Sequence, residues 1–274
     1  MRRSITALAL ALVAVGVIAG CGGKVAVNVS SIAPATQANG RPRETLDYLA
    51  ELPVPAVIMD HWGINLPITG IDCVLSDNYA GTYQATVHMI RHGYRKISVA
   101  QGDPASSPEM SERNRGYVSA LTDHGLKVPD LPRISTDDLG RGRLDALKKH
   151  LEWGTQGFVV GNDRSASTMI RRLTEMGYKV PEQIGVIGYD DEPFATALCP
   201  KLSSVRVEKG EIARRAVGML RERIETGSKG RHKMVVLRPT VVVRQSCGPN
   251  CPDPYVPDLE EFTEVDQLEA SALV

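Results

Sequence analysis

Residues 180–207 read VPEQIGVIGYDDEPFATALCPKLSSVRV and give the clearest indication of the fold. After a proline turn, residues 184–187 form a short apolar run that is typical of a buried parallel strand. The run ends abruptly at Gly188 and Tyr189, and Asp190 and Asp191 follow at once. Ligand crevices in open α/β sheets lie at the carboxyl ends of the strands. The stretch therefore predicts a parallel sheet with a binding cleft where this strand ends.

The rest of the chain alternates predicted strands and helices, which is the rhythm of an α/β protein. A strongly amphipathic helix is predicted over residues 211–225, with Gly227 as its stop. Strands are predicted at residues 25–29, 55–60, 71–75, 96–102, 133–136, 158–161, 234–237 and 240–243. With 274 residues, the chain is long enough for one large domain or two lobes.

The composition is that of an ordinary soluble protein, with 42% apolar and 23% charged residues. Lysine plus arginine and aspartate plus glutamate are balanced at 32 each, so the electrostatic footprint of a nucleic-acid binder is missing. The sequence has no G-x-S-x-G elbow, no P-loop, no H-E-x-x-H and no complete G-x-G-x-x-G. We therefore predict no enzyme and no cofactor.

Polar side chains accumulate where predicted strands end. Carboxylates and amides accept and donate several hydrogen bonds at fixed geometry, as a polyhydroxylated ligand requires. Arg113 adds a multidentate donor, and Trp62 could cover the apolar face of a sugar. The strand-end residues are Asp60, Asp77, Asn78, Gln101, Asp103, Asn162, Asp163, Asp190 and Asp191. Aspartate and asparagine also cap helices, so each alone has a structural alternative, whereas their accumulation favours a polar binding cleft.

Catalytic and metal-binding interpretations are weaker. Asp190 and Asp191 could form a glycosidase pair, but adjacent strand residues point to opposite faces, and Asp191 is predicted as a cap. His88 and His92 have the spacing of zinc ligands on a helix, yet without a third ligand a solvated helix end is favoured. Cys247 and Cys251 stand four residues apart in CGPNC. They could close a small disulfide or supply half a metal site, but two thiols in a loose tail are favoured, so no metal is predicted.

The two ends of the chain differ from its middle. Residues 1–21, MRRSITALALALVAVGVIAGC, resemble a bacterial signal peptide with a lipobox, whose Cys21 would carry the lipid. The alternatives are a buried core segment or a misplaced start codon. Residues 248–274 are proline- and acid-rich with little periodicity, and we predict a disordered acidic tail.

Taken together, the motifs resemble the LacI/GalR family of bacterial transcriptional regulators over roughly residues 24–247. The set is specific because its members stand in uninterrupted order. The motifs are Ser76-Asp77-Asn78, His92-Gly93-Tyr94-Arg95-Lys96-Ile97, Arg113-Asn114-Arg115-Gly116-Tyr117, Gly161-Asn162-Asp163, Gly188-Tyr189-Asp190-Asp191, Pro200-Lys201-Leu202-Ser203-Ser204-Val205 and Arg244-Gln245-Ser246.

The resemblance implies a type I periplasmic-binding-protein-like fold: two doubly wound parallel-sheet lobes, joined by three crossovers, with a small effector between them. It places residues 24–94 and 206–230 in the first lobe, residues 95–205 and 231–247 in the second, and the last crossover at residues 200–207. Arg113, Asn162 and Asp190 match effector-contacting positions, and Asp77 lies where a first-lobe contact is common. By resemblance the effector is a sugar or nucleoside that changes DNA affinity, and the chain forms a homodimer.

Two departures from the family leave alternatives open. The helix-turn-helix is absent, so no direct DNA contact is expected from this chain alone, and the first lobe is truncated by two βα units. The main hypothesis is a non-enzymatic effector-sensing domain, cytoplasmic by resemblance, from a truncated gene. The alternative is an exported sugar-binding lipoprotein, anchored to a membrane only if Cys21 is lipidated. A glycosidase-like enzyme is the third hypothesis.

Overall fold

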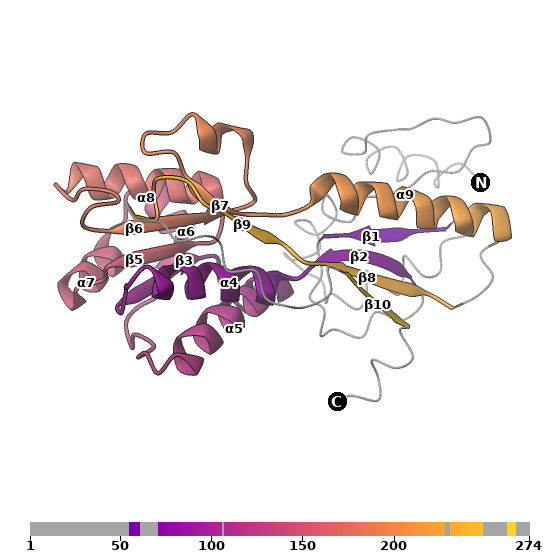
Figure 1. Cartoon of the computed structure of the whole chain (residues 1–274), viewed down its shortest axis with the longest axis horizontal. Coiled ribbons are helices and arrows are strands. Elements are labelled where there is room, and N and C mark those ends of the chain that lie inside the picture. Colours follow the sequence, from indigo (N-terminus) through magenta and orange to yellow (C-terminus); the bar gives the residue numbers. More distant parts are fainter. Residues whose placement is uncertain (1–54, 61–70, 106, 228–230, 249–261, 267–274) are drawn as a thin grey trace, which may run out of the picture. The chain divides into compact units, whose positions relative to one another are not determined.

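A computed structural model describes residues 55–60, 71–105, 107–227 and 231–248, together with the backbone of residues 262–266. The chain divides into two compact units, whose elements are labelled in Figure 1. Of the described residues, those within 77–208 and 238–248 belong to the second unit, and those within 55–76, 209–237 and 262–266 belong to the first unit. The main chain passes between the units after Ser76, Glu208 and Leu237.

The second unit is built on one six-stranded sheet with the strand order β4-β3-β5-β6-β7-β9. Neighbouring strands run parallel, except that β9 is antiparallel to β7. The strands are β3 (Ile97–Gln101), β4 (Ile134–Ser135), β5 (Gly157–Val160), β6 (Gly185–Tyr189), β7 (Ser203–Arg206) and β9 (Thr240–Val242). Parallel pairing gives this sheet one end where β3 to β7 all terminate, called here the carboxyl end, and an opposite amino end.

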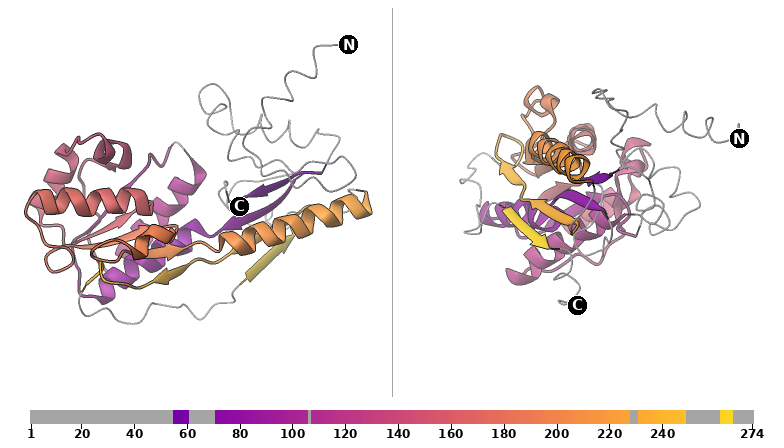
Figure 2. Two further views of the ribbon diagram at one scale, coloured as in Figure 1. Left: turned by 90° about the horizontal axis from the view of Figure 1, so that it is seen from above. Right: turned by 90° about the vertical axis from the view of Figure 1, so that its right-hand side faces the viewer.

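Helices cover both faces of the sheet (Figures 1 and 2). On one face, Leu147, Met169 and Leu173 join Phe158 and Val186 of the strands in a buried apolar core. Successive strand residues point to opposite faces, so this core takes alternate positions of each strand. The helices of the second unit are α4 (Asn78–Arg91), α5 (Pro108–Asp123), α6 (Thr136–Gly140), α7 (Asp145–Trp153), α8 (Asp163–Glu175) and the 3₁₀ helix η3 (Pro193–Thr196).

The other face carries α4 and α5. A Cβ on Gly157 of β5 would meet the Met89 side chain of α4 at 2.4 Å, which places α4 on the face opposite Phe158. Gly116 of α5 approaches the backbone of α4 so closely that a Cβ there would stand 2.3 Å from the Tyr79 carbonyl oxygen. Only glycine permits this helix–helix contact.

The first unit pairs four described strands in the order β1-β2-β8-β10 with one helix. The helix α9 (Lys209–Thr226) buries Ile212, Ala216, Met219 and Arg223, one residue per turn along a single stripe. Arg223 donates two hydrogen bonds to the buried Asp72 carboxylate, at 2.7 Å from Nε and 2.8 Å from Nη2. The strands are β1 (Val57–Met59), β2 (Asp72–Ser76), β8 (Lys233–Leu237) and β10 (Phe262–Asp266).

The α/β class and the parallel sheets are confirmed, but three predicted boundaries differ from the structure. The helix α4 was predicted in the first lobe and belongs to the second unit, whereas β8 was predicted in the second lobe and belongs to the first unit. The predicted last crossover, residues 200–207, contains β7, and the chain leaves the second unit only after Glu208. The prediction of a disordered tail is wrong for Phe262–Asp266, which pairs antiparallel with β8.

Several predicted features lie outside the described residues. These are the signal-like segment with Cys21, the strand at residues 25–29, Trp62 and Cys251. Within the part of the chain that the structure describes, no helix is both long enough and apolar enough to cross a membrane.

Candidate functional site

The end of β6 has an unusual backbone conformation. Asp190 has φ of 99° and Asp191 has φ of 48°, a region that residues with a side chain seldom occupy. Hydrogen bonds hold the turn in place: the Asp190 N–H donates to the Val205 carbonyl at 2.8 Å, and the Asp191 N–H donates to the Ser204 hydroxyl at 3.1 Å. Two strained residues in succession are costly, and such strain gathers at functional sites.

Asp191 is held by two arginines and caps no helix, so the predicted cap is wrong. Its carboxylate accepts hydrogen bonds from Arg206 Nε at 2.8 Å and from Arg244 Nη2 at 2.6 Å. Burial raises the pKa of Asp191, but the hydrogen bonds and charges of Arg244 and Arg206 outweigh it and bring the pKa below its ordinary value. Asp191 therefore fixes the turn at the end of β6.

Arg113 connects the ends of several elements at the carboxyl end of the sheet. Its Nε donates to Asn78 Oδ1 at 2.8 Å, and its Nη1 donates to the carbonyl oxygen of Gly161, the residue after β5. Its guanidinium carbon lies 3.7 Å above the ring centroid of Tyr189, the last residue of β6. The Tyr189 hydroxyl in turn donates to Asn78 Oδ1 at 3.4 Å. One arginine thus joins α4, β5 and β6.

Asn162 and Asp77 are helix caps, as the structural alternative predicted. Asn162 Oδ1 accepts from the Ser165 N–H at 2.8 Å and caps α8, and Asp77 Oδ1 accepts from the Ala80 N–H at 2.8 Å and caps α4. Burial raises the pKa of Asp77, although the Ala80 N–H and the charge of Arg238 oppose the shift. Within the described residues the Asn162 amide nitrogen donates no hydrogen bond, so capping leaves it available to a ligand.

Gln101 closes β3 beside this group. The Gly161 N–H donates to the Ala100 carbonyl at 2.8 Å, which sets the end of β3 next to the end of β5. The Gln101 amide nitrogen lies 3.3 Å from Asn114 Oδ1. Its oxygen is buried and accepts no hydrogen bond from the described residues. A buried acceptor without a donor is costly, so this oxygen calls for a water or ligand donor.

The structure thus brings the ends of β3, β5 and β6 together with Arg113, as the strand-end rule predicts. Asn162 directly follows Gly161, and Asp190 directly follows Tyr189, so both adjoin groups that Arg113 contacts. Asp77 adjoins Asn78 in the same way. Tyr189 is the residue whose role the sequence did not reveal, because it acts through its contact with Arg113.

Asp163 is a second buried carboxylate at this end of the sheet. It is fully buried, and it accepts from the Ser204 hydroxyl at 2.6 Å and from the Glu192 N–H at 2.7 Å. Burial raises the pKa of Asp163 to about 6, although both hydrogen bonds lower it. The pKa of Asp163 is therefore raised and the pKa of Asp191 is lowered, although both start from the same ordinary value of 3.8.

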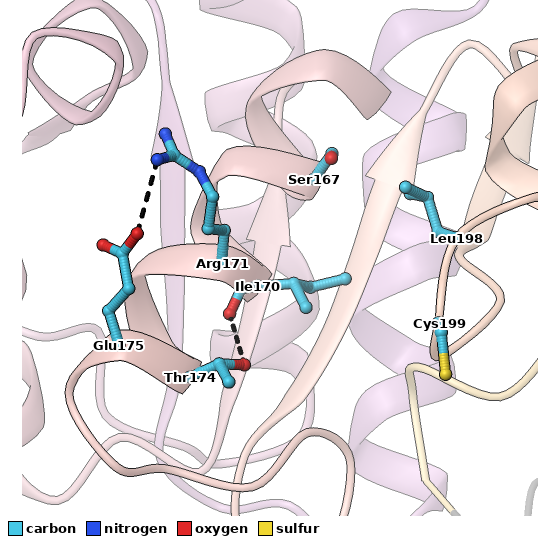
Figure 3. Close-up of a pocket in the computed structure, with 7 residues that line it drawn as sticks. All are labelled: Ser167, Ile170, Arg171, Thr174, Glu175, Leu198 and Cys199. Carbon is cyan, nitrogen blue, oxygen red and sulfur yellow. Dashed lines mark hydrogen bonds and ion pairs between the residues drawn. The ribbon is translucent and has the colours of Figure 1, made fainter.

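A pocket of about 320 Å³ opens between α8 and the loop that contains Leu198 and Cys199 (Figure 3). Arg171 and Glu175 form an exposed ion pair at 3.3 Å on its rim. The lining residues are Ser167, Ile170, Arg171, Thr174, Glu175, Leu198 and Cys199. None of the predicted site residues contributes to it, and the polar groups at the carboxyl end remain the better candidate for specific recognition.

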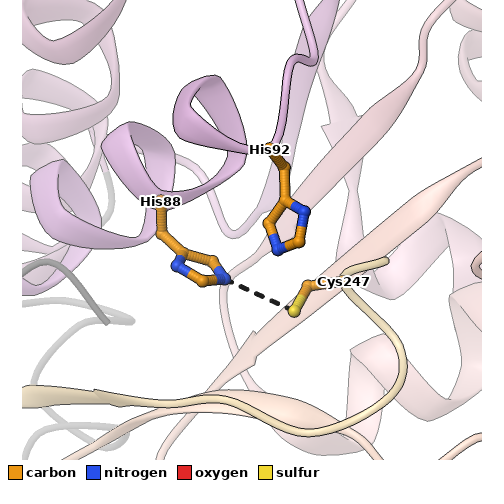
Figure 4. Close-up of side chains that lie close together, drawn as sticks. All are labelled: His88, His92 and Cys247. Atoms are coloured by element: carbon orange, nitrogen blue, oxygen red, sulfur yellow. Dashed lines mark hydrogen bonds between the residues drawn. The ribbon is translucent and has the colours of Figure 1, made fainter. Parts of the chain in front are cut away.

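The predicted solvated helix end at His88 and His92 is wrong for His88, which is fully buried. His88 Nε2 lies 3.4 Å from the Cys247 sulfur (Figure 4). Cys247 is itself fully buried, so it does not lie in a loose tail. Burial, with smaller contributions from His92 and Arg91, lowers the pKa of His88 to about 4. The sequence pattern around His88 and His92 could not reveal Cys247 as their neighbour, because Cys247 lies 159 positions beyond His88.

The comparisons with known proteins agree with this fold. The family model of the periplasmic binding protein-like domain matches residues 86–247. The HTH-type transcriptional repressor PurR of Pasteurella multocida is 31% identical over 208 residues, 74% of this chain and 60% of that protein. The ribose operon repressor of Escherichia coli is 32% identical over 174 residues, 62% of this chain and 51% of that protein. A solved regulatory protein of the LacI family from Chloroflexus aggregans has a TM-score of 0.67 at 23% identity, covering 81% of this chain and 75% of that one.

A doubly wound sheet with polar groups gathered at its carboxyl end defines a class of small-ligand-binding domains. The chain belongs to the family of periplasmic binding protein-like domains, as an effector-binding domain of LacI/GalR type. It spans about 60% of the length of several curated relatives that it matches. Those relatives are named as transcriptional repressors, not as enzymes.

Proposed function

We propose that this chain is the effector-sensing part of a LacI/GalR-type transcriptional regulator and that it binds a small polyhydroxylated effector, in the first place a sugar. The effector would bind at the carboxyl end of the second unit's sheet through Arg113, Asn162 and Asp190, with Asp77 and Gln101 beside them. The domain carries out no reaction, and binding changes the affinity of the complete regulator for DNA. Its expected assembly is a homodimer.

The observation that carries this proposal is the position of Arg113. The guanidinium stacks on Tyr189 and donates to the neutral oxygens of Asn78 and Gly161, so its orientation is fixed before a ligand arrives. Preorganised donors cost less entropy on binding than flexible ones. A second support is the buried Gln101 oxygen, which requires a donor such as a hydroxyl group.

The charge of the group favours a neutral ligand. Arg113 carries one positive charge, and Asp190 and Asp77 carry carboxylates, while Asn162 and Gln101 are neutral amides. Such a mixture of donors and acceptors suits the hydroxyl groups of a sugar or the ribose of a nucleoside, and a single strong anion would be repelled by the carboxylates. The relative named as a ribose operon repressor is consistent with that choice. The lipoprotein alternative rests on residues 1–21 alone.

The test is ligand-induced thermal stabilisation of the full chain with ribose, arabinose, cellobiose and adenosine. We expect at least one of these to raise the Tm, and we expect Arg113→Ala, Asn162→Ala and Asp190→Ala each to remove that increase. Each shift is measured against the variant's own ligand-free Tm, so a loss of stability does not count as a loss of binding. Arg171→Ala, which removes an exposed arginine from the outer side of α8, is the matched control. Unchanged shifts in all three variants would overturn the site.

A further inference from the structure

His88, His92 and Cys247 form a side-chain cluster at the amino end of the second unit's sheet (Figure 4). Their ligand atoms, two imidazole nitrogens and a sulfur, all lie within 4.8 Å of one another. His88 lies in the last turn of α4, His92 caps that helix, and Cys247 follows β9. The Val186 N–H donates to the Ser246 carbonyl at 2.7 Å, so the chain before Cys247 is fixed to the start of β6.

We propose that His88, His92 and Cys247 bind one Zn²⁺ ion. Two imidazoles and a thiolate are a donor set that zinc accepts, and three protein ligands leave a fourth position for water or another donor. Hard cations such as Mg²⁺ and Ca²⁺ prefer oxygen ligands and do not suit this cluster. The site serves a purpose different from effector binding, because it lies at the opposite end of the strands.

The distances suit a tetrahedral ion. Bonds of about 2.0–2.1 Å to nitrogen and about 2.3 Å to sulfur place neighbouring ligand atoms about 3.3–3.6 Å apart. The measured separation of His88 Nε2 and Cys247 Sγ is 3.4 Å. The rings of His88 and His92 meet edge to face, with centroids 4.9 Å apart and an interplanar angle of 80°, so both can direct a nitrogen to one point. His92 is only partly buried, so one ligand of the cluster reaches solvent.

The surroundings hold the ligands as the outer shell of a metal site does. The Ser203 hydroxyl donates to the Cys247 sulfur at 3.0 Å, and the Tyr94 hydroxyl donates to the Cys247 carbonyl at 3.1 Å. A hydrogen bond to sulfur stabilises the thiolate, the form that binds metal. A Cβ on Gly248 would stand 3.1 Å from His92 Nδ1, so glycine at this position leaves room for the ring.

Two other interpretations of the cluster make different predictions. A catalytic cysteine–histidine pair needs access for a substrate, and both Cys247 and His88 are fully buried. A disulfide between Cys247 and Cys251 would remove the thiolate and would leave the chain two hydrogens lighter in mass. Zinc binding requires the reduced thiol, so the mass of the purified chain separates these states.

The experiment uses the full chain, reduced, stripped of metal with a chelator and then titrated with Zn²⁺ against a competing dye. Co²⁺ is titrated in parallel, because tetrahedral cobalt bound to thiolate gives strong visible bands and a near-ultraviolet charge-transfer band. We expect one high-affinity equivalent. Cys247→Ser should abolish the charge-transfer band, and His88→Asn and His92→Gln should each weaken binding by at least about 100-fold. Cys199→Ser and His124→Gln, both exposed and outside the cluster, should bind like the parent chain.

Each outcome supports or overturns the proposal. If variants of the buried His88 or Cys247 do not fold, the partly exposed His92→Gln tests the site by itself. An oxidised Cys247, the lack of a high-affinity equivalent in the reduced chain, or equal Zn²⁺ affinity in His92→Gln and the parent would each overturn the site. Loss of binding in Cys199→Ser would overturn it as well.

Discussion

The two ends of one sheet carry opposite kinds of chemistry. At the carboxyl end, Arg113, Asn162 and Gln101 present oxygen and nitrogen groups suited to a hydroxylated ligand. At the amino end, His88, His92 and Cys247 present the softer donors that zinc prefers. The carboxyl end is assembled by residues that follow strands, whereas the amino end joins residues 159 positions apart in sequence. Strand-end rules therefore find the first kind of site and overlook the second.

The largest expected effect is that of Cys247→Ser, which should change the property of one end of the sheet and leave that of the other unchanged. Cys247→Ser should weaken Zn²⁺ binding by at least about 100-fold and leave the sugar-induced rise in Tm unchanged, because no effector group contacts the amino end. Dye competition and thermal unfolding on the same sample measure both quantities. A parallel loss of sugar response would show that the two ends are coupled.

The second prediction concerns pH and the two aspartates at the carboxyl end. Burial raises the pKa of Asp163 from 3.8 to about 6 in the folded protein, so the fold is stabilised when this carboxyl group is protonated. That stabilisation is complete below about pH 4 and is lost as the pH rises through about 6. The Asp163→Asn variant does not lose this stabilisation, because asparagine does not ionise. The free energy of unfolding of the variant relative to the parent should therefore rise between pH 4 and pH 7, by at most about 3 kcal/mol.

Urea unfolding at a series of pH values checks this slope. Asp191→Asn is the contrasting variant, because the pKa of Asp191 is lowered and its contribution is present above pH 3.8 and lost as pH falls. Its stability relative to the parent should fall as pH rises through the acidic range. Slopes of the same sign for both variants would contradict the assigned environments.

The third prediction concerns Arg113. Arg113→Ala should reduce effector affinity by about 1–3 kcal/mol, because a desolvated multidentate donor is removed, while Zn²⁺ affinity stays at the parent value. Arg113→Lys should restore little, since one ammonium cannot replace the planar guanidinium stacked on Tyr189. Calorimetry with the sugar that gives the largest thermal shift measures the difference. Full affinity in the lysine variant would mean that only the charge matters.

The smallest effect is expected at Gly248. Gly248→Ala would place a Cβ 3.1 Å from His92 Nδ1 in a backbone with φ of 140°, so the ring or the chain must shift by a few tenths of an ångström. We expect about tenfold weaker Zn²⁺ binding, about 1.4 kcal/mol. Gly177→Ala, at a glycine that also has a positive φ but whose Cβ would meet nothing within 4 Å, is the matched control. Equal affinity in the two variants would show that the His92 ring is not held in place by the backbone at Gly248.

The sequence predicted what depends on neighbours along the chain. The apolar run before Asp190 indicated a strand, and the caps at Asn162 and Asp77 followed from residue type. The predictions were wrong for residues whose hydrogen-bond or packing partners lie far away in the sequence. Asp191 was predicted as a cap because Arg206 and Arg244 could not be foreseen as its partners.

Helix α4 was assigned to the wrong lobe for the same reason. Its apolar face predicts burial but does not say against which sheet, and the contact of Met89 with Gly157 of β5 decides the matter. Likewise, the strand β10 is short and carries acidic residues, so its sequence resembles a tail until it is paired with β8. Hydrophobic periodicity shows which face of a helix or strand is buried, whereas only tertiary contacts show which element packs against that face.

We propose above that the effector binds at the carboxyl end of the second unit's sheet. Amide hydrogen exchange of the full chain, with and without the sugar that most raises the Tm, tests it directly. We expect slower exchange at residues 161–165 and 189–192, and at the first turn of α4, with no change around Cys247. Protection confined to the pocket between α8 and Leu198–Cys199, or no protection with any of the four ligands, would contradict this site.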